Sequence, residues 1–409
     1  SPAELFLATV LLSAPAGNEV FSKDLVKEHL EPWSRDTGVP ADEVIALGSH
    51  EGMFNLTALS IRLSASTNGV SELHGQVSSD MWRPLFPAEA NPPVFAITNG
   101  VHTETWIGPE MRGFLTREMG ADWGPQLLEP GAWDKVRQAP DESLLGARRA
   151  QKERLVRYVR ERVRRQAARE GYGPADLRRL ETLLDPTALT LGFARRFATY
   201  KRAVLLLRDL DRAKALLLDP RRPVQLIFAG KAHPADREGQ EFIRKLAVLS
   251  RSELSGRIVF LEDYDIAMAR ILVQGVDVWL NTPRKPLEAS GTSGQKAAIN
   301  GALNLSIADG WWAEGFSGDN GFLIDGGEAT IPAAEDGMTE AVAGSGGLSL
   351  EERQDEIDAR ALYEQMENRV VPLFYGGKAP GASPEWVRMM KESIATIAPR
   401  FSARRMVRD

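Results

Sequence analysis

Two short stretches of the 409-residue sequence combine charged and small residues in patterns that could do chemistry. The first, EASGTSGQKAAINGAL, opens with Glu288, turns through small residues and places Lys296 at the start of an apolar segment. An amine in an apolar site has a lowered pKa, as covalent attachment to an aldehyde requires. The loop before it has the composition of a backbone site for a phosphate or sugar. It fits neither the Walker A spacing nor a dinucleotide fingerprint.

The second stretch, GFARRFATYKRA, gathers Arg195, Arg196, Lys201 and Arg202 among aromatic residues. If a turn precedes a helix here, Arg196 and Lys201 can converge on one anion with help from the N–H groups of the helix N-terminus. An amphipathic helix with solvated arginines explains the same composition. The residues alone leave both interpretations open.

Two junctions between strands and turns supply further candidates. NPPVFAITNGVHTETW reads as a strand that ends in a Thr-Asn-Gly turn at Asn99, and open α/β sheets hold ligands at such junctions. FAGKAHP ends another strand with Lys231 and His233. For His233 an ordinary loop histidine is the commoner interpretation.

These stretches need elements that bring them together, and the pattern predicts an α/β fold. From about residue 190, short apolar runs typical of doubly buried strands alternate with helical segments. We expect a parallel, doubly wound sheet, with strands at Val224–Gly230, Arg257–Asp263 and Asp277–Pro283 and helices at Pro234–Leu249 and Asp265–Val273. Residues 325–352 read as a surface loop, and Ala147–Glu170 as a solvated amphipathic helix.

Composition limits the class of protein. A net charge of -6 argues against a nucleic-acid binder, and the absence of cysteine excludes disulfides, thiolate nucleophiles and zinc–cysteine sites. We expect no metal site and a reducing, cytoplasmic compartment. The apolar run Leu5–Leu12 lacks the charged leader of a signal peptide and reads as a buried strand. No other apolar run approaches the length of a membrane span.

Together these motifs resemble one family, the α-glucan (glycogen and maltodextrin) phosphorylases, particularly the shorter bacterial type. EASGTSGQKAAINGALN resembles the family's pyridoxal-phosphate segment, and GFARRFATYKRA resembles its phosphate-site segment. STNGVSELHG, NGVHTETW, FAGKAHP and FLEDY follow in the family order. The resemblance runs across nearly the whole chain and covers the C-terminal half to two thirds of the family's length.

The resemblance implies a GT-B-like α/β fold, with two Rossmann-like lobes facing a cleft and the N-terminal lobe incomplete. The implied divisions are the end of the glucan-binding lobe (1–106), a helical connection (107–190), the cofactor lobe (191–383) and a C-terminal helix (384–409). The implied reaction is phosphorolysis of α-1,4-glucan by inorganic phosphate to glucose 1-phosphate, with retention. In this family the phosphate of pyridoxal 5'-phosphate is thought to donate and accept the proton. The resemblance also admits a homo-oligomer.

By the same resemblance, Lys296 carries the cofactor. The remaining implied roles are catalytic for Arg196, Lys201 and Glu288, cofactor-binding for Arg195, Tyr264, Gly291 and Thr292, and substrate-binding for Asn99, Tyr200, Ala289 and Ser290.

The sequence departs from the family at two positions. Leu11 stands where the family has a sugar-binding His, and loss of one such donor can cost about 10²-fold in rate. Gln295 stands where a Met is usual. A truncated or non-catalytic relative that binds cofactor or glucan therefore stays an alternative. A glycosyltransferase of the glycogen-synthase type is another, but it needs a carboxylate for the nucleotide ribose where this chain has Lys296, whose ammonium accepts no hydrogen bond.

Overall fold

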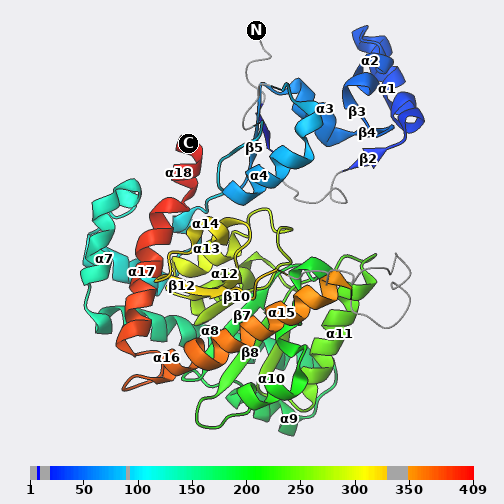
Figure 1. Cartoon of the computed structure of the whole chain (residues 1–409). Coiled ribbons are helices and arrows are strands. Elements are labelled where there is room, and N and C mark those ends of the chain that lie inside the picture. The colour runs from blue at the N-terminus through cyan, green and yellow to red at the C-terminus, as the bar shows by residue number, and fades with distance from the viewer. Residues whose placement is uncertain (1–6, 10–18, 89–92, 329–348) are drawn as a thin grey trace, which may run out of the picture.

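The computed structural model describes residues 7–9, 19–88, 93–328 and 349–409 (Figure 1). Its main layer is a six-stranded parallel sheet in the order β12-β11-β10-β7-β8-β9. The strands are β7 (Leu189–Ala194), β8 (Val224–Ala229), β9 (Ile258–Leu261), β10 (Val278–Asn281), β11 (Leu303–Ile307) and β12 (Gly321–Ile324). The chain runs outward from β7 to β9, then returns beside β7 and runs outward again from β10. The fold is therefore α/β, with a topological switch point between β7 and β10.

The two faces of this sheet are both apolar, as the continuous hydrophobic runs of the sequence predict. Along β8, Leu226 and Phe228 enter one core, while Ile227 and Ala229 enter the other. One face is covered by α8 (Asp141–Arg169) and α12 (Ile266–Gly275). The other is covered by α10 (Leu210–Leu217), α11 (Arg237–Arg251), α15 (Leu350–Gln365) and α17 (Pro384–Arg400).

Arg148 of α8 ties helix ends together beneath the switch point. It is 6% exposed, and its guanidinium donates to the carbonyls of Gln274 at 2.7 Å, Val276 at 2.5 Å and Asn300 at 2.9 Å. Gln274 lies at the end of α12, and Asn300 lies just after α13 (Ser293–Ala298). These carbonyls have no partner within their own helices, so Arg148 supplies the donors that they would otherwise lack.

The remaining helices connect and extend this layer. They are α5 (Thr103–Trp106), α6 (Pro109–Met119), α7 (Asp134–Gln138), α9 (Pro174–Arg179), α14 (Trp311–Gly315), α16 (Val371–Tyr375) and α18 (Ala403–Arg408). No helix among the described residues combines the length and the apolarity needed to cross a membrane.

The N-terminal segment, residues 7–9, 19–88 and 93–101, forms two small sheets. One is parallel, in the order β1-β5-β6 (Leu7–Thr9, Ser66–Gly69, Phe95–Ala96); the other is antiparallel, in the order β2-β4-β3 (Val20–Phe21, Met53–Asn55, Ser49–His50). The helices of this segment are α1 (Lys23–Thr37), α2 (Ala41–Gly48), α3 (Leu56–Leu63) and α4 (Glu72–Met81). Figure 1 shows α1 and α2 standing away from the main sheet. Helix α1 buries no residue, and its Trp33 is 43% exposed.

Several expectations change in detail. Gly192–Ala203 is not an amphipathic helix: β7 ends at Ala194, and only a short 3₁₀ turn, Thr199–Lys201, follows. Helix α15 begins at Leu350, inside the expected loop 325–352, because Ser349 and Glu352 form a capping box. Most of that loop, residues 329–348, lies outside the described residues, as does Leu11; of the run Leu5–Leu12, only Leu7–Thr9 is described, as β1.

Candidate functional site

The loops that leave β7 and β10 meet at the carboxyl edge of the sheet, where open α/β sheets bind ligands. Arg195 is the first residue after β7, and Asn281 is the last residue of β10. The two strands are neighbours in the sheet, so Arg195 can donate a hydrogen bond to Asn281 Oδ1. The same guanidinium lies 2.7 Å from Glu288 Oε2. The switch point thus brings a cation of the second stretch against the carboxylate of the first.

Glu288 is the centre of a buried cationic cluster. Lys201 Nζ bonds the same carboxylate oxygen as Arg195, and both Glu288 and Lys201 are 7% exposed. Burial acts to raise the pKa of Glu288, but Arg195 and Lys201 outweigh it and hold that pKa below its usual range. Burial and the neighbouring Arg195 lower the pKa of Lys201 to about 8, against the opposing effect of Glu288. Because two cations share one carboxylate, the cluster keeps a positive charge with which a further anion could pair.

Tyr200 and Arg196 border this cluster. The Lys201 ammonium lies 4.5 Å from the centre of the Tyr200 ring. Burial raises the pKa of the Tyr200 phenol, Glu288 adds to that rise, and a hydrogen bond with Arg196 opposes it. Arg196 is itself exposed, so its guanidinium remains accessible to a ligand at the edge of the cluster.

The loop Glu288–Gly291 is held from below by residues that follow β11. Asp309 accepts hydrogen bonds from the Glu288 N–H at 2.9 Å and the Gly310 N–H at 2.8 Å. The Ser290 carbonyl accepts the Trp311 N–H at 2.8 Å. Gly310 has φ +52°, and a Cβ there would lie 2.4 Å from the Ser290 oxygen. Burial raises the pKa of Asp309 to about 7.

The same loop keeps polar groups unused. Across the part of the chain that the structure describes, the N–H groups of Ala289, Ser290 and Gly291 donate to no protein acceptor. The Ser290 hydroxyl is buried and also lacks a partner among the described residues. Gly291 adopts φ +82°, a conformation that side chains rarely tolerate. Such groups suit a ligand rich in oxygen atoms, because buried polar groups are otherwise hydrogen-bonded.

Lys296 projects from α13 beside this loop. Its Nζ lies 4.0 Å from the centre of the Trp106 ring. Burial, with a smaller effect from Arg195, lowers the pKa of the amine, which is the direction that the apolar surroundings in the sequence predict. Thr292 precedes α13 as its N-cap residue, and its side chain makes no capping hydrogen bond. An amine with a lowered pKa and an adjacent helix start could hold a carbonyl compound that carries a phosphate.

Asn99 and Tyr264 come from two other segments of the chain. Asn99 belongs to the N-terminal segment, and its carbonyl accepts a hydrogen bond from Gln295 Nε2 of α13 at 2.9 Å. Tyr264 follows β9, and burial raises the pKa of its phenol, with an opposing effect from Arg195. Every predicted site residue therefore lies at the carboxyl edge of the sheet or on the segment that contacts it.

Sequence reasoning missed three residues of the site: Trp106, Asn281 and Asp309. Asn281 and Asp309 stand at the end of an apolar strand or just after it, the same signal that drew attention to Arg195. Using that signal would have required the strand order, which places β7 beside β10.

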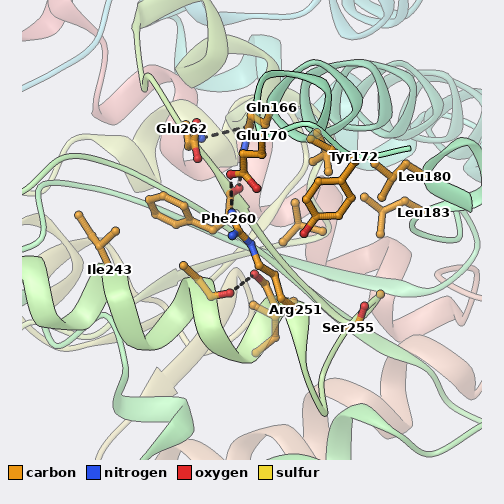
Figure 2. Close-up of a pocket in the computed structure, with 17 residues that line it drawn as sticks. Gln166, Glu170, Tyr172, Leu180, Leu183, Ile243, Arg251, Ser255, Phe260 and Glu262 are labelled. Carbon is orange, nitrogen blue, oxygen red and sulfur yellow. Dashed lines mark hydrogen bonds and ion pairs between the residues drawn. The ribbon is translucent and has the colours of Figure 1, made fainter. Parts of the chain in front are cut away.

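A separate hollow lies at the β9 edge of the sheet (Figure 2). It has a volume of about 410 Å³ and lies between the end of α8, α11 and β9. Gln166 donates to the Phe260 carbonyl and accepts the Glu262 N–H, each at 3.2 Å, so its amide pairs with the edge strand. Glu170 and Arg251 form a 2.6 Å ion pair nearby. No predicted site residue lines this hollow.

The geometry defines a class of protein: a doubly wound α/β protein with a cluster of cations around one carboxylate at its switch point. Comparison with known proteins gives the family. Residues 19–314 match the family model described as carbohydrate phosphorylase. The chain belongs to this family, as the motifs predicted.

Individual relatives of the chain are also named as phosphorylases. The maltodextrin phosphorylase of Thermococcus litoralis is 43% identical over 402 residues, which are 97% of this chain and 44% of that protein. The glycogen phosphorylase of Mycobacterium tuberculosis is 40% identical over 408 residues, 97% of this chain and 45% of that protein. The glycogen phosphorylase of Aquifex aeolicus is 41% identical over 378 residues, 91% of this chain and 51% of that protein. The chain thus spans about half the length of the curated relatives it matches.

Proposed function

We propose that this chain carries the cofactor and phosphate site of an α-glucan phosphorylase. The enzyme cleaves α-1,4-glucan with inorganic phosphate and releases glucose 1-phosphate with retention of configuration. The architecture is of the GT-B type: the six-stranded sheet is the core of the cofactor lobe, and the N-terminal segment belongs to the glucan-binding lobe.

The residues at the switch point fit pyridoxal 5'-phosphate. Lys296 has the lowered amine pKa that covalent attachment requires, and Trp106 offers an aromatic face beside it. Gly291 and Thr292 stand at the start of its helix, where a phosphate would bind, and Arg195 lies close enough to lower the pKa of the amine. We assign Tyr264, which lies close enough to Arg195 for that cation to affect its pKa, to the cofactor as well. When bound, the cofactor supplies through its phosphate a group that can give and take a proton.

Arg196 and Lys201 bind the attacking inorganic phosphate. A phosphate dianion beside the cofactor's phosphate requires several cationic partners, because like charges in contact repel strongly. With a pKa of about 8, Lys201 is a cation at neutral pH, and its ammonium can lose a proton more easily than that of an ordinary lysine. Arg196 is exposed at the edge of the cluster and is accessible to phosphate from solvent.

The loop after Glu288 binds the glucosyl unit. The carboxylate accepts hydrogen bonds from sugar hydroxyls, and the unpaired N–H groups of Ala289, Ser290 and Gly291 donate to them. Asn99 and Tyr200 complete the sugar contacts. Fixed donors and acceptors of this kind stabilise developing charge without reorganising during the reaction.

One observation carries the proposal: three cations and one carboxylate converge at the switch point, beside an amine of lowered pKa. Arg195 and Lys201 both contact Glu288, and Arg195 is also close enough to Lys296 to lower its pKa. This cluster carries more positive than negative charge, and two phosphate groups would neutralise the excess.

The test is to load the purified chain with pyridoxal phosphate, reduce it with borohydride and map the modified lysine. We expect the label on Lys296, its loss in Lys296→Arg, and its retention in Lys285→Ala, which changes an exposed lysine of the neighbouring loop. The same preparation is assayed for glucose 1-phosphate from maltoheptaose and phosphate. Label without product supports a relative that binds cofactor without turnover, and no label at Lys296 refutes the proposal.

A further inference from the structure

The segment around Asn99 is held from several directions at once. The Asn99 N–H donates to Val70 in its own segment at 3.0 Å, while its carbonyl accepts Gln295 of α13 at 2.9 Å. Val101 exchanges two backbone hydrogen bonds with the chain after α17, to Phe401 and from Ala403, each at 2.8 Å. The N-terminal segment is therefore fixed to the main layer directly beside the site.

One carboxylate joins three parts of this contact. Glu314 of α14 accepts hydrogen bonds through Oε1 from the Glu72 N–H at 3.0 Å and the Thr98 hydroxyl at 2.8 Å. Its other oxygen lies 3.5 Å from Arg400 of α17. The Glu314 side chain is 7% exposed. A buried carboxylate with two donors from one segment and a cation from another holds both in register.

The position of Glu314 bears on the sugar loop as well. Glu72 is the first residue of α4, and a carboxylate at a helix N-terminus is favoured by the helix dipole. The N-cap residue of the same helix, Ser71, donates its hydroxyl to the Ala289 carbonyl at 2.7 Å. Holding the start of α4 therefore also holds Ser71 against the loop Glu288–Gly291.

We infer that Glu314 is a positioning residue, which holds Asn99 and Ser71 of the N-terminal segment against the sugar loop. The inference rests on the proposed function for the role of Asn99 as a sugar contact. The position that Glu314 fixes is a property of the chain itself and can be measured without turnover. Glu314 does not touch the cationic cluster, so its effect on the reaction acts through Asn99 and Ser71.

The chain contains no cysteine, so a label pair can be introduced without background. Gln76→Cys on α4 and Glu364→Cys on α15, both at exposed positions, carry spin labels for a distance distribution by pulsed electron resonance. We expect one narrow distribution in the labelled parent and a broader one in Glu314→Ala. Asp319→Ala removes an exposed carboxylate from the loop between α14 and β12, whose ion pair with Arg388 stays within the main layer, and should leave the distribution narrow.

A second pair of variants separates positioning from folding. Glu314→Gln keeps an acceptor oxygen and should restore part of the narrow distribution. If Glu314→Ala does not fold, Thr98→Val removes one donor while keeping the carboxylate, and should broaden the distribution on its own. Distributions identical to that of the parent in Glu314→Ala, or in Thr98→Val where Glu314→Ala does not fold, would overturn the inference.

The reaction provides the other readout. Loss of Glu314 should lower kcat by about 10–100-fold, the equivalent of one or two charge-assisted hydrogen bonds, with less change in KM. Labelling of Lys296 by pyridoxal phosphate should be unchanged, which a general loss of structure would not allow. A parent without turnover would count against the proposed function, while the distance measurement would still decide the role of Glu314.

Discussion

Gly310→Ala tests the support beneath the sugar loop. Gly310 has φ +52° and ψ -134°, a conformation that costs a residue with a side chain about 1–3 kcal/mol. The new Cβ would also meet backbone atoms: it would lie 2.4 Å from the Ser290 oxygen, where ordinary contact begins at 3.4 Å. Because these neighbours are backbone atoms, no side chain can rotate to make room.

Two effects of known size follow from this geometry. Overpacking adds about 1–3 kcal/mol to the conformational cost, so the free energy of unfolding should fall by about 2–6 kcal/mol in total. The loop must also retreat by about 1 Å, and a displacement of that size at a reacting centre can lower the rate about 10²-fold.

Gly318→Ala is the matched control. Gly318 also has a positive φ, +91°, but a Cβ there meets nothing within 4 Å. It should therefore carry the conformational cost without the displacement of the loop. Urea unfolding of both variants gives the difference between their free energies of unfolding, which we expect to be about 1–3 kcal/mol. Titration with pyridoxal phosphate should show weaker binding in Gly310→Ala alone.

Equal stability and equal cofactor binding of the two variants would refute this prediction. That result would mean that the loop Glu288–Gly291 moves freely, and that its hydrogen bonds to Asp309 and Trp311 do not fix it.

Three further predictions concern buried charges. Glu288→Gln leaves Arg195 and Lys201 without their shared carboxylate and should cost about 3–5 kcal/mol in urea unfolding, with partial recovery in added phosphate; equal stability of variant and parent in buffer would contradict the cluster. Asp309 has a folded pKa of about 7, above its ordinary value of 3.8, so its contribution to stability is full below pH 4 and is lost as pH rises towards 7. The free energy of unfolding of the parent, relative to Asp309→Asn, should therefore fall by about 1.4 kcal/mol for each pH unit at the steepest part of this window, whereas a constant difference would refute the raised pKa. Arg148→Met orphans three carbonyls at helix ends and should lower the urea midpoint by the equivalent of about 3–5 kcal/mol with an unchanged m-value; a loss below about 1 kcal/mol would show that other donors replace the guanidinium.

The sequence was most informative about the strands and least informative about their order. The apolar runs at β8, β9 and β10 are continuous because both faces of the sheet are buried, so they are readable locally. The neighbourhood of β7 and β10 depends on the path of the whole chain. That path brings Arg195 to Asn281, and nothing in the sequence around either residue indicates that the other is its partner.

In the site too, local properties could be predicted from the sequence and contacts between remote segments could not. Lys296 could be predicted to sit in apolar surroundings, because its neighbours in the sequence are also its neighbours on α13. Asp309 and Glu314 could not, because they act on backbone groups of remote segments, at Glu288 and at Glu72. A carboxylate that serves a distant N–H looks in the sequence like any acidic residue near a strand end.

The backbone hydrogen bonds between Val101 and residues 401–403 also limit when the site can be completed during synthesis. At the same contact the Gly100 N–H donates to Met406 Sδ, and these two residues are 306 positions apart. At the usual rate of translation, the Asn99 segment leaves the ribosome about 15–60 s before the residues that hold it. The cofactor lobe can begin to fold in that interval, but the sugar side of the site can be completed only after the last helices have been made.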